Sequence, residues 1–224
     1  MKIANIHFPT FNNNNYDNTE TQYMSGYRNK AYIRKVSSSD KIKAITGSLI
    51  GTTIPMAIMM KKQKIKNPLK LEYSMRDMVG MSGGSIVGGV TLGLIGEEKE
   101  VRTNRLKEGF FLFMNAAIPT WIVGGVLSLC NHSKKHNNIK NKILSTIGGL
   151  LVGMYGSAAL ANVITDPKDK HPDRKLTYND ALANIDDAIG VFVLAKFPFA
   201  DKLKLEKLLP LIYVMCGYRA GKSN

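Results

Sequence analysis

Long uncharged stretches, separated by short and strongly charged segments, dominate the pattern of apolar and polar positions along this chain. The longest stretches that contain no Asp, Glu, Lys or Arg are Ala44–Met60, Met78–Gly96, Gly109–Ser133 and Ile143–Thr165. A soluble protein would interleave charge at the period of a helix or strand. Uncharged runs of this kind are typical of membrane-spanning helices, although the first is short and contains Pro55, which would kink it.

The sequence therefore predicts an all-α fold, a polytopic transmembrane helical bundle with a disordered N-terminal tail. Residues 1–40 are polar and rich in asparagine, which predicts the disorder. Residues 41–165 would form a four-helix transmembrane core, with the mixed-charge segment Glu97–Glu108 as a loop. Residues 166–224 would form a charged loop and an amphipathic C-terminal helical pair, 181–200 and 208–218. This pair would lie in the interface or span, raising the count to five or six spans.

Small residues recur at every fourth position within the predicted spans. The glycines predicted to pack helices together are Gly47, Gly51, Gly80, Gly84, Gly88, Gly124, Gly149 and Gly153. In a bilayer the backbone must hydrogen-bond to itself, and small residues on one face let a neighbouring helix approach closely. The glycine-rich segment Ser82–Gly89 lacks the lysine that reaches phosphates in a P-loop, so that function is excluded.

Five residues are candidates for a substrate or ion route: Asn115, Pro119, Asn162, Asp186 and Asp187. A proline removes a backbone donor and frees a carbonyl one turn earlier, as in the broken helices of carriers. Alternatively, the asparagines only hydrogen-bond a neighbouring helix. The aspartates would serve a cation or proton route if their segment is inserted. If it is interfacial, they are ordinary charges near a helix N-terminus.

The formal net charge of +14 is concentrated beside the uncharged runs, for example in Lys61–Lys70. Anionic lipid headgroups would lie there, so the expected partner is a lipid bilayer with anionic headgroups at the basic loops. Read alone, Lys61–Lys70 resembles a nucleic-acid patch. Beside an apolar run it is more typical of a juxtamembrane loop, and no nucleic acid is expected. The glycine faces also allow a homo-oligomer or a membrane partner.

The spacing of reactive side chains does not predict an enzyme. No nucleophile–base pair or carboxylate pair appears at usable spacing, and no cofactor or metal is expected. His132 and His136 are separated by two lysines and fit a solvated basic loop. Cys130 and Cys216 are too few for a disulfide framework. Because the N-terminus lacks an apolar run of signal length, we expect a multi-pass membrane location without a cleaved signal peptide.

The glycine-striped spans after a polar tail resemble, in architecture, the mitochondrial inner-membrane preprotein translocase channel family, over roughly Lys43–Thr165. That family's signature joins a separated loop arginine and aspartate to a Gly-Gly helix. Here Arg76 and Asp77 are adjacent, so membership is not inferred. The expected function is a small carrier or channel for a small solute or ion. The alternative is a non-catalytic membrane assembly or scaffold protein that packs through its glycine-striped helices.

Overall fold

A computed structural model of the protein describes residues 36–133, 137–168, 173, 176, 189–190, 192–193 and 203–222. The helices with described bounds are α1 (Ser38–Gln63), α2 (Met75–Gly93), α3 (Lys99–His132), α4 (Ile139–Thr165) and α7 (Leu209–Lys222). Two 3₁₀ turns accompany them, η2 (Pro68–Lys70) and η3 (Leu205–Lys207). No strand occurs among the described residues, which confirms the all-α class for this part of the chain.

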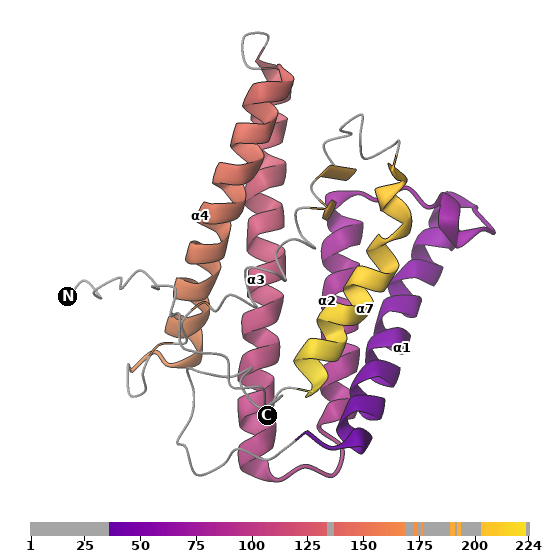
Figure 1. The fold of residues 1–224 in the computed structure, drawn as a ribbon, viewed down its shortest axis with the longest axis vertical. Helices are drawn as coiled ribbons and strands as arrows, with labels where there is room; N and C mark the ends of the chain where they lie inside the picture. Colours follow the sequence, from indigo (N-terminus) through magenta and orange to yellow (C-terminus); the bar gives the residue numbers. More distant parts are fainter. Residues whose placement is uncertain are drawn as a thin grey trace.

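The described helices form two sets that lie side by side (Figure 1). In the first set, α1, α2 and α7 all contact one another. In the second, α3 and α4 form an antiparallel hairpin, one end of which extends beyond the other helices (Figure 1). The helix α2 contacts α1, α3 and α7, so it joins the two sets.

Two helices begin at the same kind of local signal. Ser37 Oγ accepts a hydrogen bond from the Asp40 backbone at 3.2 Å, and Asp40 Oδ2 accepts one from the Ser37 backbone at 2.8 Å. Ser74 and Asp77 make the same reciprocal pair at the start of α2. These capping boxes satisfy backbone donors that the first turn leaves free. As a result α1 begins at Ser38, just before the predicted start of the core at residue 41.

The prediction of a loop over Glu97–Glu108 is wrong from Lys99 onward, because α3 begins there. Glutamate, lysine, arginine and leucine are good helix formers, and their charge does not mark a loop. Arg105 and Glu108 are buried within this helical segment. The 34 residues of α3 rise about 51 Å, so the helix is longer than a hydrocarbon core of about 30 Å.

Among the described helices, three are long and apolar enough to cross a membrane: α1, residues Val101–His132 of α3, and α4. The predicted second span corresponds to α2, which is not among them. Its first turn carries Arg76 and Asp77, and its glycines contribute little hydropathy. The 14 residues of α7 would rise about 21 Å, less than a bilayer core. A count of four or more spanning helices therefore stays a prediction.

The two ends of the chain are described only in part. Residues 1–35, which make up most of the predicted disordered tail, lie outside the described residues. The first helix of the predicted C-terminal pair, 181–200, also lies almost wholly outside them. The second corresponds to α7, which runs alongside α1 and α2 rather than across their ends (Figure 1).

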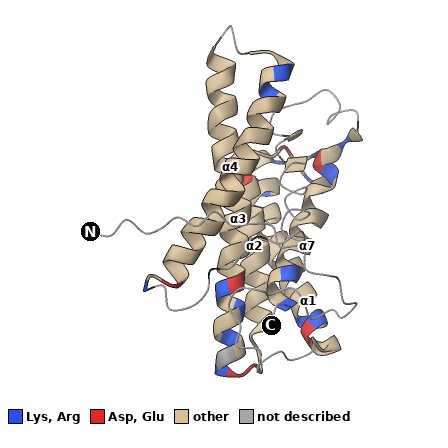
Figure 2. Ribbon diagram, turned by 60° about the vertical axis from the view of Figure 1, so that its left-hand side comes forward, with Lys and Arg blue, Asp and Glu red and all other residues tan. Residues whose placement is uncertain are grey.

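On α1 and α4, small and polar side chains are mostly buried and large aliphatic side chains are exposed, an arrangement that we call the inside-out distribution. The buried residues are mostly small or polar: Ala44, Gly47, Ser48, Gly51 and Thr52 on α1, and Thr146, Gly149, Gly153, Ser157, Ala158, Ala161 and Asn162 on α4. The exposed residues include Ile42, Leu49, Ile50, Ile54 and Ile58 on α1, and Leu144, Ile147, Leu151, Val152, Val163 and Ile164 on α4. Charged residues are found mostly toward the helix ends (Figure 2). This distribution is compatible with a membrane protein.

Candidate functional site

Two of the five route candidates lie at the interface of α3 and α4. Asn115 is 3% exposed, and Ser157 Oγ donates a hydrogen bond to Asn115 Oδ1 at 3.1 Å. Pro119, one turn further along α3, faces Gly153: a Cβ added to Gly153 would lie only 2.8 Å from the Cβ of Pro119. The two helices therefore make close backbone contact beside both candidates. Because Pro119 has no N–H, the Asn115 carbonyl lacks its usual helical donor.

Further polar side chains follow the same interface. Thr120 Oγ1 donates to the Ala116 carbonyl at 2.8 Å. Thr146 is 1% exposed, and its hydroxyl has no hydrogen-bond partner among the described residues. Asn162, the third candidate, is buried on the inward face of α4 that also carries Ser157. Asp186 and Asp187, the remaining candidates, lie outside the described residues.

Four of the glycines named for helix packing face one another across α1 and α2. A Cβ added to Gly47 would collide with the carbonyl of Gly88 and would lie 3.0 Å from the Cβ of Leu92. A Cβ added to Gly51 would collide with the carbonyl of Gly84. Since the obstructing atoms belong to the backbone, α1 and α2 approach this closely only because these positions are glycine.

The other glycines named from the sequence have different surroundings. A Cβ at Gly149 would lie 2.8 Å from Val123 Cγ2 in α3, and one at Gly124 would collide with the thioether of Met75 in α2. Gly153 faces Pro119, as described above. Gly80 is exposed, with nothing within 4 Å of an added Cβ. Even spacing along a helix therefore does not by itself identify a contact.

A second glycine interface, between α2 and α7, is absent from the sequence-based prediction. A Cβ at Gly89 would collide with the carbonyl of Gly217, and one at Gly93 would collide with the carbonyl of Gly221. Within each helix the two glycines are four residues apart, so the spacing of Gly217 and Gly221 in the last helix could have indicated this contact from the sequence. The helix α2 therefore presents glycines on two faces, one toward α1 and the other toward α7.

Two buried serines lie where α1, α2 and α7 meet. Ser48 Oγ and Ser85 Oγ are 2.9 Å apart, and both side chains are fully buried. Each hydroxyl donates its single proton to α7, Ser48 to the carbonyl of Val214 and Ser85 to the carbonyl of Tyr213. A buried hydroxyl costs free energy unless it is hydrogen-bonded, so these contacts favour one register of α7. Sequence reasoning missed them because isolated serines in apolar runs carry no distinctive spacing.

The turn between α2 and α3 contains a buried ion pair. Arg105 is fully buried, and its guanidinium lies 3.6 Å from Glu97 Oε1 and donates to the carbonyl of Gly93. From α1, Lys43 Nζ donates to the carbonyl of Ile95 at 2.7 Å. Cations near the last carbonyls of a helix are favourable. Side chains from both α1 and α3 thus cap the end of α2.

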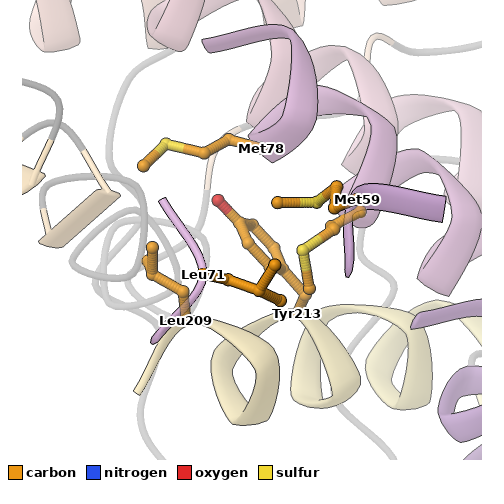
Figure 3. Close-up of a cluster of buried hydrophobic side chains, with 6 residues drawn as sticks. Met59, Leu71, Met78, Leu209 and Tyr213 are labelled. Carbon is orange, nitrogen blue, oxygen red and sulfur yellow. The ribbon is translucent and has the colours of Figure 1, made fainter. Parts of the chain in front are cut away.

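A methionine-rich cluster lies at the other end of α2. Its buried members are Met59, Leu71, Met78, Met81, Leu209 and Tyr213, and Figure 3 shows the labelled side chains converging from α1, α2, α7 and the residue that follows η2. Tyr73 packs against this cluster. Burial, together with the nearby charge of Glu206, raises the pKa of Tyr73 to about 12, so this environment disfavours the ionised phenolate.

The described residues contain no group of three or more His, Cys, Asp or Glu that could hold a metal ion. Comparison with protein-family models, with curated proteins and with solved structures finds no match. The function is therefore inferred from the molecule's own geometry.

Proposed function

We propose that the chain is a multi-pass integral membrane protein that acts as a non-catalytic assembly component, with its small and polar side chains holding the helices together. The inside-out distribution on α1 and α4 carries this proposal. Burying one leucine or isoleucine side chain is worth about 1.5–3 kcal/mol in water. Lipid acyl chains are as apolar as leucine, so the outward aliphatic residues lose nothing in a bilayer.

The interior contacts support assembly over transport. Asn115 accepts a hydrogen bond from Ser157, and the hydroxyls of Ser48 and Ser85 donate to carbonyls of α7. Such interhelical hydrogen bonds stabilise association by roughly 1 kcal/mol each in membranes. Asn115, Ser157, Ser48 and Ser85 thus take part in joining helices.

The single tryptophan allows a test without any substitution. Trp121 is 47% exposed and lies near the middle of the uncharged part of α3. In reconstituted vesicles, we expect phospholipids brominated deep in their acyl chains to quench its fluorescence strongly, and aqueous iodide to quench it weakly. The detergent-unfolded protein, in which iodide reaches the indole, is the control. Strong iodide quenching in intact vesicles would contradict the membrane location.

A carrier or channel is the second candidate, and one observation favours it. Pro119 lies inside the apolar part of α3, where its ring nitrogen cannot donate a backbone hydrogen bond. Helices interrupted within the bilayer form the ion and substrate sites of many membrane carriers. The buried Asn162 lies on the facing helix.

Replacing Asn115 with leucine separates the two candidates. An assembly role predicts unchanged solute flux and a loss of about 1 kcal/mol in stability from removal of the bond to Ser157. A transport role predicts that Asn115→Leu abolishes solute flux while the protein still inserts into the membrane. Flux of sodium, potassium and protons into proteoliposomes is the measurement, with Asn162→Leu in parallel. The control is Val163→Leu, at a position 58% exposed on the outer face of α4.

A further inference from the structure

The two 3₁₀ turns meet beside the end of α1 and form one surface, residues 61–72 and 203–208, which we call the 3₁₀ platform. The turns η2 and η3 contact each other, and α7 begins directly after η3. Leu71 and Leu209, which are 2% and 0% exposed, fasten the platform to the methionine-rich cluster (Figure 3).

Specific hydrogen bonds hold the first half of the platform in one shape. The side-chain amide of Gln63 donates to the carbonyl of Glu72 at 2.7 Å and accepts from the Glu72 N–H at 3.0 Å. Asn67 Oδ1 accepts from the Leu69 backbone at 2.9 Å. Lys64 ends α1 in the left-handed conformation, with φ 56°. The side chains of this segment are therefore presented from an ordered backbone.

Three leucines of the platform point outward although neighbouring leucines are buried. Leu69, Leu203 and Leu208 are 54%, 67% and 45% exposed. The cluster below the platform accepts Leu71 and Leu209, so apolar burial is available to the same two segments. The outward leucines are thus left without a partner within the described part of the chain.

The platform is strongly basic. Its exposed cations are Lys61, Lys62, Lys64, Lys66, Lys70, Lys204 and Lys207, and its acidic residues are Glu72 and Glu206. The platform also begins where the apolar outer face of α1 ends, since Ile58 is 63% exposed and the lysines start at Lys61. Apolar and cationic surfaces therefore adjoin at this end of the molecule.

We propose that the 3₁₀ platform binds anionic phospholipid headgroups at the membrane–water interface, with its three outward leucines in the outer part of the acyl-chain region. This inference rests on the membrane location proposed above. Charge complementarity selects an anion, and leucines interleaved with lysines are typical of segments that lie in the interface. A nucleic acid would use the lysines but would leave the leucines in water.

Paired lysine substitutions test the headgroup contact. The platform variant carries Lys70→Gln and Lys207→Gln, and the matched control carries Lys99→Gln and Lys168→Gln, which are exposed at other helix ends. Binding of phosphatidylglycerol and of phosphatidylcholine to the detergent-solubilised protein is measured by native mass spectrometry. We expect the platform variant to bind phosphatidylglycerol roughly 30-fold more weakly, from about 1 kcal/mol per lysine, with phosphatidylcholine unchanged.

Two outcomes would overturn the proposal. An equal loss in the control variant would indicate general surface charge only. Tighter binding of a single-stranded oligonucleotide than of phosphatidylglycerol, lost in the platform variant, would assign the surface to nucleic acid instead.

A depth measurement tests the leucines independently. In a Trp121→Phe background, Leu69→Trp places the only indole on the platform. We expect lipids brominated near the headgroup to quench it more than lipids brominated deep in the chain. Strong iodide quenching would refute the platform contact. Because Trp121 of the natural chain reports on the membrane location separately, failure of the platform and failure of the proposed function give different results.

Discussion

Replacing Gly47 with alanine should lower the free energy of unfolding by about 1–3 kcal/mol, the usual range for overpacking. The added Cβ would meet the carbonyl of Gly88, and a backbone atom cannot rotate away as a side chain can. The two helices must separate, which also strains the contact between Ser48 and Ser85 one position further along. Unfolding of the detergent-solubilised protein by dodecyl sulfate, followed by circular dichroism, measures the change.

Gly80→Ala is the matched control for this substitution. Gly80 lies in α2, like Gly88, but nothing lies within 4 Å of an added Cβ. Alanine is the better helix former by about 1 kcal/mol in water, so we expect no loss, or a small gain, in stability. Equal losses at Gly47 and Gly80 would show that the close approach of α1 and α2 is not what the glycines provide.

Replacing Arg105 with alanine should have the larger effect, a loss of about 3–5 kcal/mol, as when one partner of a buried ion pair is removed. The substitution takes the cation away from Glu97, whose side chain is 3% exposed, and from the carbonyl of Gly93. Both groups lie at the junction of α2 and α3. Chemical unfolding in the same detergent system gives the magnitude.

Two further variants show whether the ion pair is the cause. Lys99→Ala removes an exposed cation from the first turn of the same helix and should change stability little. Adding Glu97→Gln to Arg105→Ala should recover part of the loss, since the buried carboxylate is then neutral. If Lys99→Ala costs as much as Arg105→Ala, net charge rather than the buried pair governs stability.

The hydropathy pattern predicted the helical class and located the long helices, but it did not predict where each of them begins. It placed the fourth run at Ile143–Thr165, and α4 ends at Thr165 but begins at Ile139. It failed at the start of α3, because a window of apolar residues cannot distinguish a charged helix end from a charged loop. The starts of α1 and α2 were readable, because Ser37 and Ser74 are each followed three residues later by an aspartate.

The candidate site was predictable in composition but not in pairing. Spacing identified small residues that suit close contact, yet it did not show that Gly47 faces Gly88 or that Gly80 faces open space. Asn115 stood out because an amide in an apolar run is rare. Its partner Ser157 did not, because serine is common among small residues. Pairing depends on which helices are neighbours, and that is a property of the tertiary structure.

The place of α7 in the chain has a consequence for biosynthesis. Among the described helices, α7 emerges last from the ribosome, yet it supplies the carbonyls that Ser48 and Ser85 contact and the glycines that face Gly89 and Gly93. While α3 and α4 are being synthesised, the surface of α1 and α2 that contacts α7 is not yet covered by it. The three-helix set can therefore be completed only after α3 and α4 have been synthesised.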